Sequence, residues 1–341
     1  MYLCNYNLVV IALYIMKRTL SLTLTISMLA VFSLASCDRH DDNTTVIHDT
    51  VYITLGTETP TSGFDQYGAS KSTFSVGEGV SVRFSRGNLQ YQASTGTWRF
   101  AEHQYDYIGN ANANISSTYS GWIDLFGWGT SGWNSGASCY QPWATGTSSS
   151  YYYPGGIYTN SLTGDYAKAD WGVYNAIFNG GNSAGMWRVL TKDEFEYLMF
   201  NRSSSSLGGT PDARFAKATV SGNEGLIIFP DNFTMPSSLN MVSSINSIDV
   251  SYDVNVYNSN QWEQMEANGA VFLPAAGIRG SEGMWGCGME GGYWTSTYGE
   301  SSYDGPGAYL LYFMGTGVYT PDVCIRNYAR FDGRSVRLVK A

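Results

Sequence analysis

Charged residues are scarce in this chain, at 14% of its 341 residues, against roughly 25% in an average soluble domain. Basic residues are the scarcer kind, since 19 Lys and Arg stand against 28 Asp and Glu and give a formal net charge of −9. Binding to nucleic acid depends on many basic side chains that neutralise phosphates. The sequence therefore predicts no nucleic-acid partner. Its 43% apolar content, rich in aromatics, excludes a disordered chain.

Histidine is almost absent, with three residues in the chain. His40 and His48 precede the expected folded domain, so His103 is its one imidazole. A metal site built from several His residues, or a Ser-His-Asp triad, is therefore not expected. The G-x-S-x-G sequence at 181–185 has no His after it and does not predict a nucleophile elbow. We expect no metal and no cofactor.

The N-terminal segment has the layout of a secretory signal. Lys17 and Arg18 precede an uncharged stretch, whose apolar run at 20–34 is shorter than the roughly 20 residues that a membrane-spanning helix needs. A basic start, an apolar centre and small residues before a cleavage point are typical of a signal peptide. We expect residues 1–36 to be removed, with Met16 as the true start; the alternative is an uncleaved membrane anchor.

The signal ends in Leu-Ala-Ser-Cys, which resembles the lipobox of bacterial lipoproteins. The resemblance implies that Cys37 becomes N-terminal and carries acyl chains such as palmitate, which together anchor durably. The acidic run at 38–42 resembles the export signal of Bacteroidota lipoproteins. It implies an outer-membrane protein that faces outside, although a plain solvated tether explains the same residues. Residues 37–73 are predicted to be a flexible tether.

Three cysteines remain in the expected domain: Cys139, Cys287 and Cys324. An odd number permits one bridge and one spare thiol. Cys287 and Cys324 are a possible disulfide pair, and buried free thiols are an equal alternative.

Short strands and two helices predict an α+β domain over residues 74–341. Alternating residues indicate a strand at 80–84, and residues 89–91 and 98–100 indicate a hairpin that turns at Gly96. Thr191 and Glu194 form a capping box that opens a first helix, and a second is expected over 260–268 with Trp262 and Met265 inward. Further strands are predicted at 271–273, 293–295, 309–313 and 335–339.

Residues 109–185 are rich in Gly, Ser, Asn and Tyr and lack helical periodicity, so they predict long loops, which in compact domains are often functional. Sugar rings pack their C–H faces on Trp and Tyr, while nearby polar side chains bond the hydroxyls. The alternative is that these aromatics form small cores within the loops. A second site is considered at 283–303. The candidate ligand-binding residues are Trp122, Asp124, Trp128, Trp133, Trp143, Tyr151, Tyr152 and Tyr153.

Four phrases resemble the Fibrobacter succinogenes major paralogous domain family, and they agree with it in order and spacing. The phrases are WRVLTKDEF at 187–195, FLPAAGIR at 272–279, GYWTST at 292–297 and GRSVRLV at 333–339. The family is related to the formylglycine-generating enzyme and the C-type-lectin-like fold. The resemblance implies one such domain with short strands, two helices and long loops, whose first strand at 80–84 pairs with its last at 336–339.

The resemblance also bears on catalysis. Formylglycine-generating enzymes bind copper through a closely spaced cysteine pair, whereas Cys287 and Cys324 are 37 residues apart. We therefore expect a non-catalytic module that binds glycan or protein ligands. The alternatives are an enzyme of the formylglycine-generating type, a glycan-processing enzyme in which two of Asp124, Asp165, Asp170 and Glu290 meet, and a structural component of a surface complex or pilus.

Overall fold

The computed structural model describes residues 63–302, 305–315 and 323–341. All of them belong to one compact unit, Pro60–Ala341. The predicted signal peptide, Cys37 and the tether up to residue 62 lie outside the described residues. No helix in the described part of the chain is long and apolar enough to cross a membrane.

The folded unit begins before the predicted boundary at Phe74. Ala69 and Ser70 are fully buried, and Ser70 donates its backbone N–H to the Phe84 carbonyl at 2.8 Å. Asp65 pairs with Arg83 at 3.1 Å. Residues 63–73 are therefore part of the domain. Their polar composition resembles a tether because, apart from Phe64, the residues that are buried here are small.

The unit is a mixed α+β fold, with several small sheets, few helices and many loops. In the first sheet the strand order is β1-β2-β14, and Val339 lies opposite Phe84. The predicted pairing of the strand at 80–84 with the C-terminal strand is confirmed, although β14 is shorter than expected. The strands of this sheet are β1 Phe74–Gly77, β2 Val80–Phe84 and β14 Val339–Lys340.

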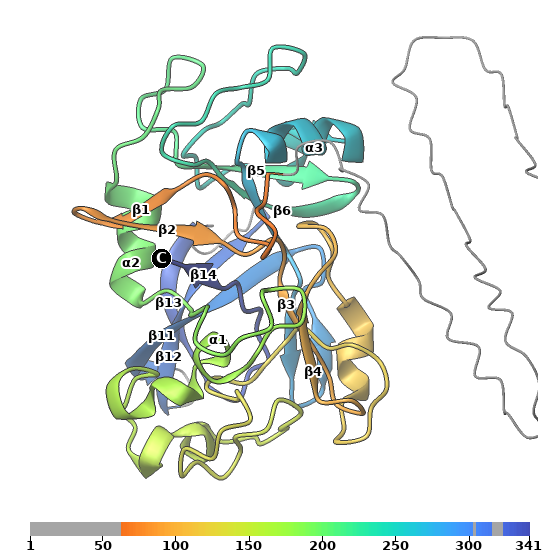
Figure 1. Cartoon of the computed structure of the whole chain (residues 1–341), viewed down its shortest axis with the longest axis vertical. Helices are drawn as coiled ribbons and strands as arrows, with labels where there is room; N and C mark the ends of the chain where they lie inside the picture. Colours follow the sequence, from red (N-terminus) through yellow and green to blue (C-terminus); the bar gives the residue numbers. More distant parts are fainter. Residues whose placement is uncertain (1–62, 303–304, 316–322) are drawn as a thin grey trace, which may run out of the picture. The chain divides into compact units, whose positions relative to one another are not determined.

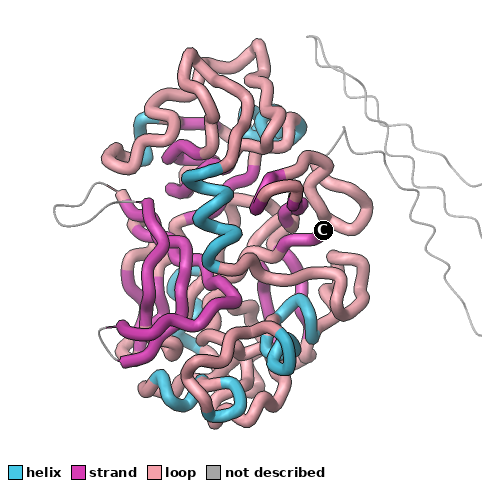
Figure 2. Tube along the Cα trace, turned by 90° about the vertical axis from the view of Figure 1, so that its left-hand side faces the viewer, coloured by secondary structure: helices cyan, strands magenta, loops and turns pink. Residues whose placement is uncertain are grey.

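The second sheet is antiparallel, in the order β11-β12-β13, and the helical segment α2–η5 lies beside it (Figure 2). The predicted capping box is confirmed: the Glu194 carboxylate accepts the Thr191 N–H at 2.8 Å, and the Glu194 N–H donates to the Thr191 hydroxyl at 3.2 Å. Phe195 is buried as expected. The elements are α2 Lys192–Glu196, the π-helix η5 Tyr197–Asn201, β11 Glu290–Ser302, β12 Gly305–Met314 and β13 Val323–Tyr328.

The third sheet has the order β7-β5-β6-β8 and carries helix α3. The second predicted helix is confirmed, with Trp262 and Met265 buried, and it begins one residue earlier because Asn258 caps it. This sheet lies at one end of the unit, and residues 109–185 lie at the other (Figure 1). The elements are β5 Phe215–Val220, β6 Asn223–Ile228, β7 Val256–Tyr257, α3 Ser259–Ala267 and β8 Val271–Pro274.

Two hairpins complete the strands. The predicted turn at Gly96 is confirmed, and its φ of +65° is a backbone conformation that favours glycine. The hairpins are β3 Leu89–Gln92 with β4 Thr97–Phe100, and β9 Ile278–Gly280 with β10 Gly283–Trp285.

Residues 109–185 form long loops with short helical turns, as predicted. The longest of these turns spans six residues. The turns there are η1 Gly109–Asn114, η2 Ser149–Tyr152, η3 Pro154–Gly156, η4 Gly164–Ala169 and α1 Trp171–Tyr174; η6 Tyr252–Val254 lies elsewhere.

Candidate functional site

Three of the predicted ligand-binding side chains are packed inside the loop region. Trp128 and Asp124 are fully buried and Tyr152 is 1% exposed. The Trp128 indole donates its N–H to the Thr295 carbonyl at 2.8 Å. These side chains have no face to offer a ligand. Trp128 packs in a core cluster that includes strand residues such as Trp294, so it belongs to the core of the domain and not to a small core within the loops.

Three further candidates are partly buried against the core. The Arg99 guanidinium lies 3.8 Å from the centre of the Trp122 ring. Trp143 stacks on Tyr91 with ring centres 6.2 Å apart, and Trp133 packs against the same core cluster. Most of their ring surface is used within the protein.

One exposed aromatic surface of the loops lies at residues 151–158, and Tyr174 and Phe178 are exposed elsewhere in the loops. Tyr151 is 45% exposed and Tyr158 is 44% exposed. Tyr153 is half-buried, with its ring centre 6.3 Å from that of Tyr158. Of the eight predicted residues, Tyr151 has the most open ring, and the neighbouring Tyr158 was not among them.

A buried arginine holds this aromatic segment in place. The Arg330 guanidinium lies between two rings, 4.4 Å from the centre of Trp128 and 4.7 Å from that of Tyr153. It donates to the Gly307 carbonyl at 2.7 Å and to the Tyr158 carbonyl. Burial lowers the pKa of Arg330 to about 10. The sequence does not single out this residue, because its partners are far from it along the chain.

The four carboxylates considered for glycan cleavage have separate partners. Asp124 accepts from the Ile108 N–H at 2.9 Å and from the Asn112 amide at 2.8 Å, and Asp170 accepts from the Gly172 and Val189 N–H groups at 2.9 Å each. Burial raises the pKa of Asp124 and of Asp170 to about 6. Both fix backbone.

Of the other two carboxylates, one forms an ion pair and the other is exposed. Glu290 pairs with Arg334 at 2.9 Å and accepts from the Tyr312 hydroxyl at 2.9 Å. Asp165 is exposed on η4. Nowhere in the described residues do three or more His, Cys, Asp or Glu side chains gather to hold a metal ion.

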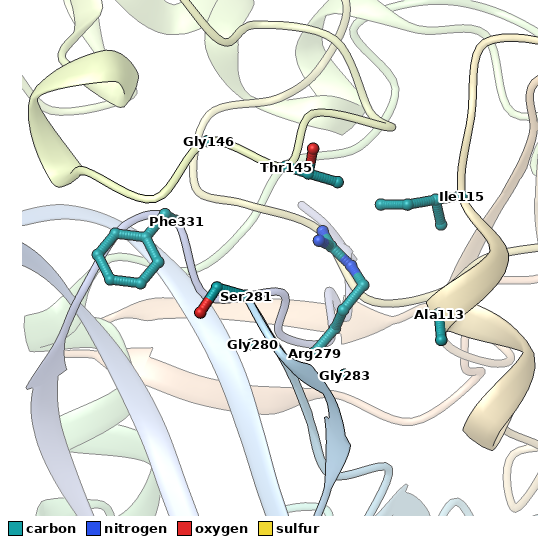
Figure 3. A pocket seen from close by; sticks show the side chains of 9 residues that line it. All are labelled: Ala113, Ile115, Thr145, Gly146, Arg279, Gly280, Ser281, Gly283 and Phe331. Carbon is teal, nitrogen blue, oxygen red and sulfur yellow. The ribbon is translucent and has the colours of Figure 1, made fainter.

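A small pocket of about 110 Å³ opens between the loop region and the β9–β10 hairpin. Figure 3 shows the Arg279 guanidinium pointing into it, toward Thr145, with Ile115 to one side and Ser281 and Phe331 to the other. Arg279 is 4% exposed. None of the described residues that line the pocket is acidic. The lining residues are Ala113, Ile115, Thr145, Gly146, Arg279, Gly280, Ser281, Gly283 and Phe331.

The pocket adjoins the exposed aromatic surface. A Cβ placed on Gly146 would lie 3.0 Å from the Tyr151 ring and 3.2 Å from the Tyr152 ring, so the loop backbone at Gly146 lies directly against both. The exposed ring of Tyr151 is thus next to a concave site with one cation and two hydroxyls. We define this candidate site as Tyr151 together with the pocket.

A second, wider depression of about 530 Å³ lies at the other end of the unit. Its lining is hydroxyl and apolar, and none of these described residues is charged: Ser205, Ser206, Leu207, Gly208, Phe233, Thr234, Met235 and Met241. It lacks both an exposed aromatic ring and a charged group that could orient a ligand.

The possible Cys287–Cys324 disulfide is not formed. Cys139 and Cys287 are free thiols, and the Cys287 thiol donates to the Ala276 carbonyl at 3.6 Å. Cys324 Sγ instead accepts from Arg326 at 3.1 Å. Burial raises the pKa of Cys287 above that of an ordinary thiol, which disfavours the reactive thiolate.

Comparison with known proteins adds no relative. No family model, curated protein or solved structure matches this chain.

Proposed function

We propose that this chain is a lipid-anchored outer-membrane protein, attached through Cys37 and facing outside, whose folded unit binds glycan or protein ligands without catalysis. We also propose that the unit is a C-type-lectin-like domain of the Fibrobacter succinogenes major paralogous family. The pairing of β2 with β14 supports this second proposal, because the family's fold implies that the first and last strands meet.

The observation that carries the binding function is the exposed Tyr151 ring beside the Arg279 pocket. An aromatic face next to convergent polar groups in a concave site is typical of sites that bind small or ring-shaped ligands. A glycan suits the site better than a flat apolar ligand, because Thr145 and Ser281 place hydroxyls at the pocket beside the cation. Arg330 holds the segment that ends at Tyr158, which limits the entropy lost on binding.

Hydrolysis of a glycan needs two carboxylates on opposite sides of the bond that breaks. The described residues lining the pocket include none, and Asp124 and Asp170 are buried while bonding backbone. These observations favour binding over the glycan-processing alternative. Stoichiometric copper binding lost in a Cys287→Ser variant would favour the formylglycine-generating alternative, and polymeric assembly would favour a structural role.

The test is a glycan and mucin array probed with the full chain and with a Tyr151→Ala variant. We expect saturable binding that the variant weakens at least about tenfold, because the exposed ring supplies the stacking face. Tyr174→Ala is the matched control, since Tyr174 is 40% exposed on α1 outside the pocket lining and should bind like the parent. Binding unaffected by Tyr151→Ala would place the site elsewhere, and no binding would direct the search to protein partners.

Anchoring is tested separately in cells. We expect Cys37→Ser to abolish labelling by a palmitate analogue and to move the protein out of the membrane fraction. Protease added to intact cells should digest the parent protein if it faces outside. Retention of the variant in the membrane would favour the uncleaved anchor.

A further inference from the structure

Arg279 is a buried cation with a fixed position. Its backbone exchanges two hydrogen bonds with Gly333, at 3.0 and 2.8 Å. A Cβ on Gly333 would lie 2.9 Å from both the Cβ and the Nε of Arg279, so the absence of that Cβ lets the arginine side chain lie against the backbone there. The guanidinium is therefore held at the pocket rather than swinging freely.

This guanidinium has few partners for a buried charge. Among the described residues its one hydrogen bond is from Nη2 to the Leu125 carbonyl at 3.4 Å, and Nε has no partner there. It forms no ion pair with a carboxylate of the described residues. Asp332 influences its charge from a distance longer than that of an ion pair. Burial lowers the pKa of Arg279. A buried charge without a partner is destabilising, so a ligand that supplies the opposite charge gains affinity here.

The pocket has the groups that an oxyanion requires. Arginine presents a planar fork of donors that matches carboxylate or sulfate oxygens, and bonds between ionised groups are stronger than neutral ones. The hydroxyls of Thr145 and Ser281 stand at the same pocket, while Ile115 and Phe331 form its apolar walls (Figure 3). A volume of about 110 Å³ suits one small charged group rather than a whole sugar ring.

We propose that Arg279 binds the carboxylate or sulfate oxyanion of an acidic sugar residue, with the sugar ring outside the pocket against Tyr151. This inference rests on the proposed glycan binding and adds the chemical class of the ligand. The net charge of −9 repels acidic glycans at long range. Screening at about 0.15 M ionic strength limits that repulsion to about 8 Å, so the short-range contact with Arg279 decides the selectivity.

The experiment measures Kd by calorimetry at about 0.15 M salt for two matched probe pairs. One pair is 3′-sialyllactose against lactose, and the other is 6-sulfo-N-acetyllactosamine against N-acetyllactosamine. We expect the acidic member of at least one pair to bind about tenfold or more tighter than its neutral partner. The two pairs separate a carboxylate ligand from a sulfate ligand.

Two variants test the assignment of this selectivity. Arg279→Gln removes the charge, and Thr145→Phe covers the guanidinium from an exposed position without changing Arg279. Both should bring acidic and neutral probes to within about twofold of each other. Arg83→Gln, which removes a surface arginine paired with Asp65, should keep the parent's selectivity.

The outcomes separate this inference from the proposed function. Glycan binding without acidic preference, or a preference that survives Arg279→Gln, overturns the Arg279 assignment and leaves glycan binding standing. Failure of all four probes, with failure on the array, overturns both. Arg279-dependent binding of poly-L-glutamate in place of the glycans overturns the sugar ligand and favours an acidic peptide.

Discussion

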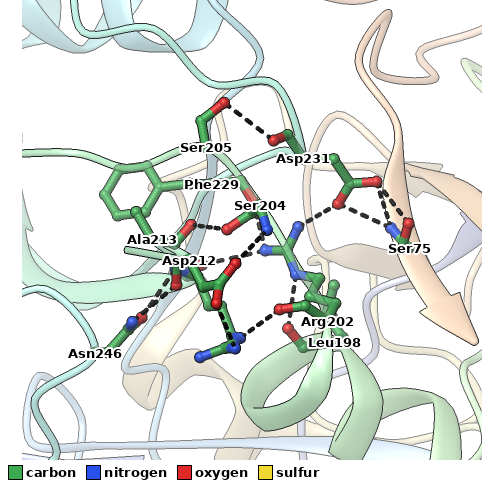
Figure 4. Close-up of polar contacts among 11 residues, drawn as sticks. Ser75, Leu198, Arg202, Ser204, Ser205, Asp212, Ala213, Phe229, Asp231 and Asn246 are labelled. Atoms are coloured by element: carbon green, nitrogen blue, oxygen red, sulfur yellow. Dashed lines mark hydrogen bonds and ion pairs between the residues drawn. The ribbon is translucent and has the colours of Figure 1, made fainter. Parts of the chain in front are cut away.

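Two buried arginines, Arg202 near the third sheet and Arg279 at the loop region, differ sharply in their surroundings. Arg202 is fully buried, pairs with Asp231 at 2.6 Å and donates from Nε to the Leu198 carbonyl at 2.7 Å. Asp231 is held in turn by the backbone N–H and hydroxyl of Ser75 (Figure 4). Arg279 is nearly as buried, and its guanidinium makes one long hydrogen bond within the described residues.

The comparison distinguishes a charge that stabilises the fold, at Arg202, from a charge that is available to a ligand, at Arg279. The Arg202 network joins the end of η5 to β1 and satisfies its charge within the fold. Arg279 makes few such links, so its burial is not compensated within the described residues. Of these two arginines, Arg279 is therefore the better candidate for a binding group.

The largest expected effect on stability comes from replacing Arg202. Arg202→Met removes one partner of a buried ion pair, so Asp231 loses its cation and the Leu198 carbonyl loses the Arg202 donor. We expect the free energy of unfolding to fall by about 3–5 kcal/mol, measured by urea denaturation. Lys192→Met is the control, because its pair with Glu196 is on the surface and should contribute less than about 1 kcal/mol. Equal losses in the two variants would contradict the structural role of Arg202.

The next effect concerns Arg330, which is buried and bonded but has no carboxylate partner in the described residues. Arg330→Met should lower the free energy of unfolding by about 2 kcal/mol, because the Gly307 and Tyr158 carbonyls lose their donor. The segment at 151–158 should also be cut faster by protease in the folded protein. Unchanged cleavage would show that Arg330 does not hold this segment.

A smaller effect is expected from Asp124, a buried carboxylate that forms no ion pair within the described part of the chain. Burial raises the pKa of Asp124 from 3.8 in the unfolded chain to about 6, so between these values the folded state binds the extra proton. As the pH falls from 7 to 5, this group should therefore add about 1 kcal/mol to the free energy of unfolding.

The Asp124→Asn variant tests this contribution. Its free energy of unfolding should gain less than the parent's over the same pH range, even though losing an acceptor lowers its absolute stability. Asp165→Asn removes an exposed carboxylate and should follow the parent. Identical pH dependence in Asp124→Asn and parent would mean that Asp124 stays ionised throughout.

The smallest expected effect concerns Arg279, and it tests most directly the difference between Arg279 and Arg202. Arg279→Met should change the free energy of unfolding by less than about 1 kcal/mol, because it removes an unpaired charge and keeps most of the side-chain volume. The measurement is urea denaturation without added anion. A loss as large as that of Arg202→Met would show that Arg279 is a structural residue.

Local signals in the sequence predicted much of the fold. The capping box at Thr191, the buried face of α3 and the turn at Gly96 each depend on residues within a few positions of one another, and all three are confirmed. Alternation also found β2. The strands β5 and β6 were missed, and the domain boundary was set too late.

The candidate site depended far less on local pattern. The sequence drew attention to the loop region and to Tyr151, but aromatic residues look alike in sequence whether they fill a core or face solvent. Trp128 is buried in a core cluster, and its indole N–H is satisfied there by the carbonyl of Thr295, 167 residues away. Only the path of the chain brings such partners together.

The dependence on distant partners also explains why the sequence did not distinguish Arg202 from Arg279. Short-range capping, alternation and turn chemistry fixed the type and position of several elements, because their physics acts within one or two turns of chain. Whether a buried charge finds a partner depends on side chains from distant segments: Arg202 meets Asp231 29 positions away, whereas Arg279 meets the Leu125 carbonyl across 154. Tertiary structure alone decided that one charge is satisfied and the other faces a pocket.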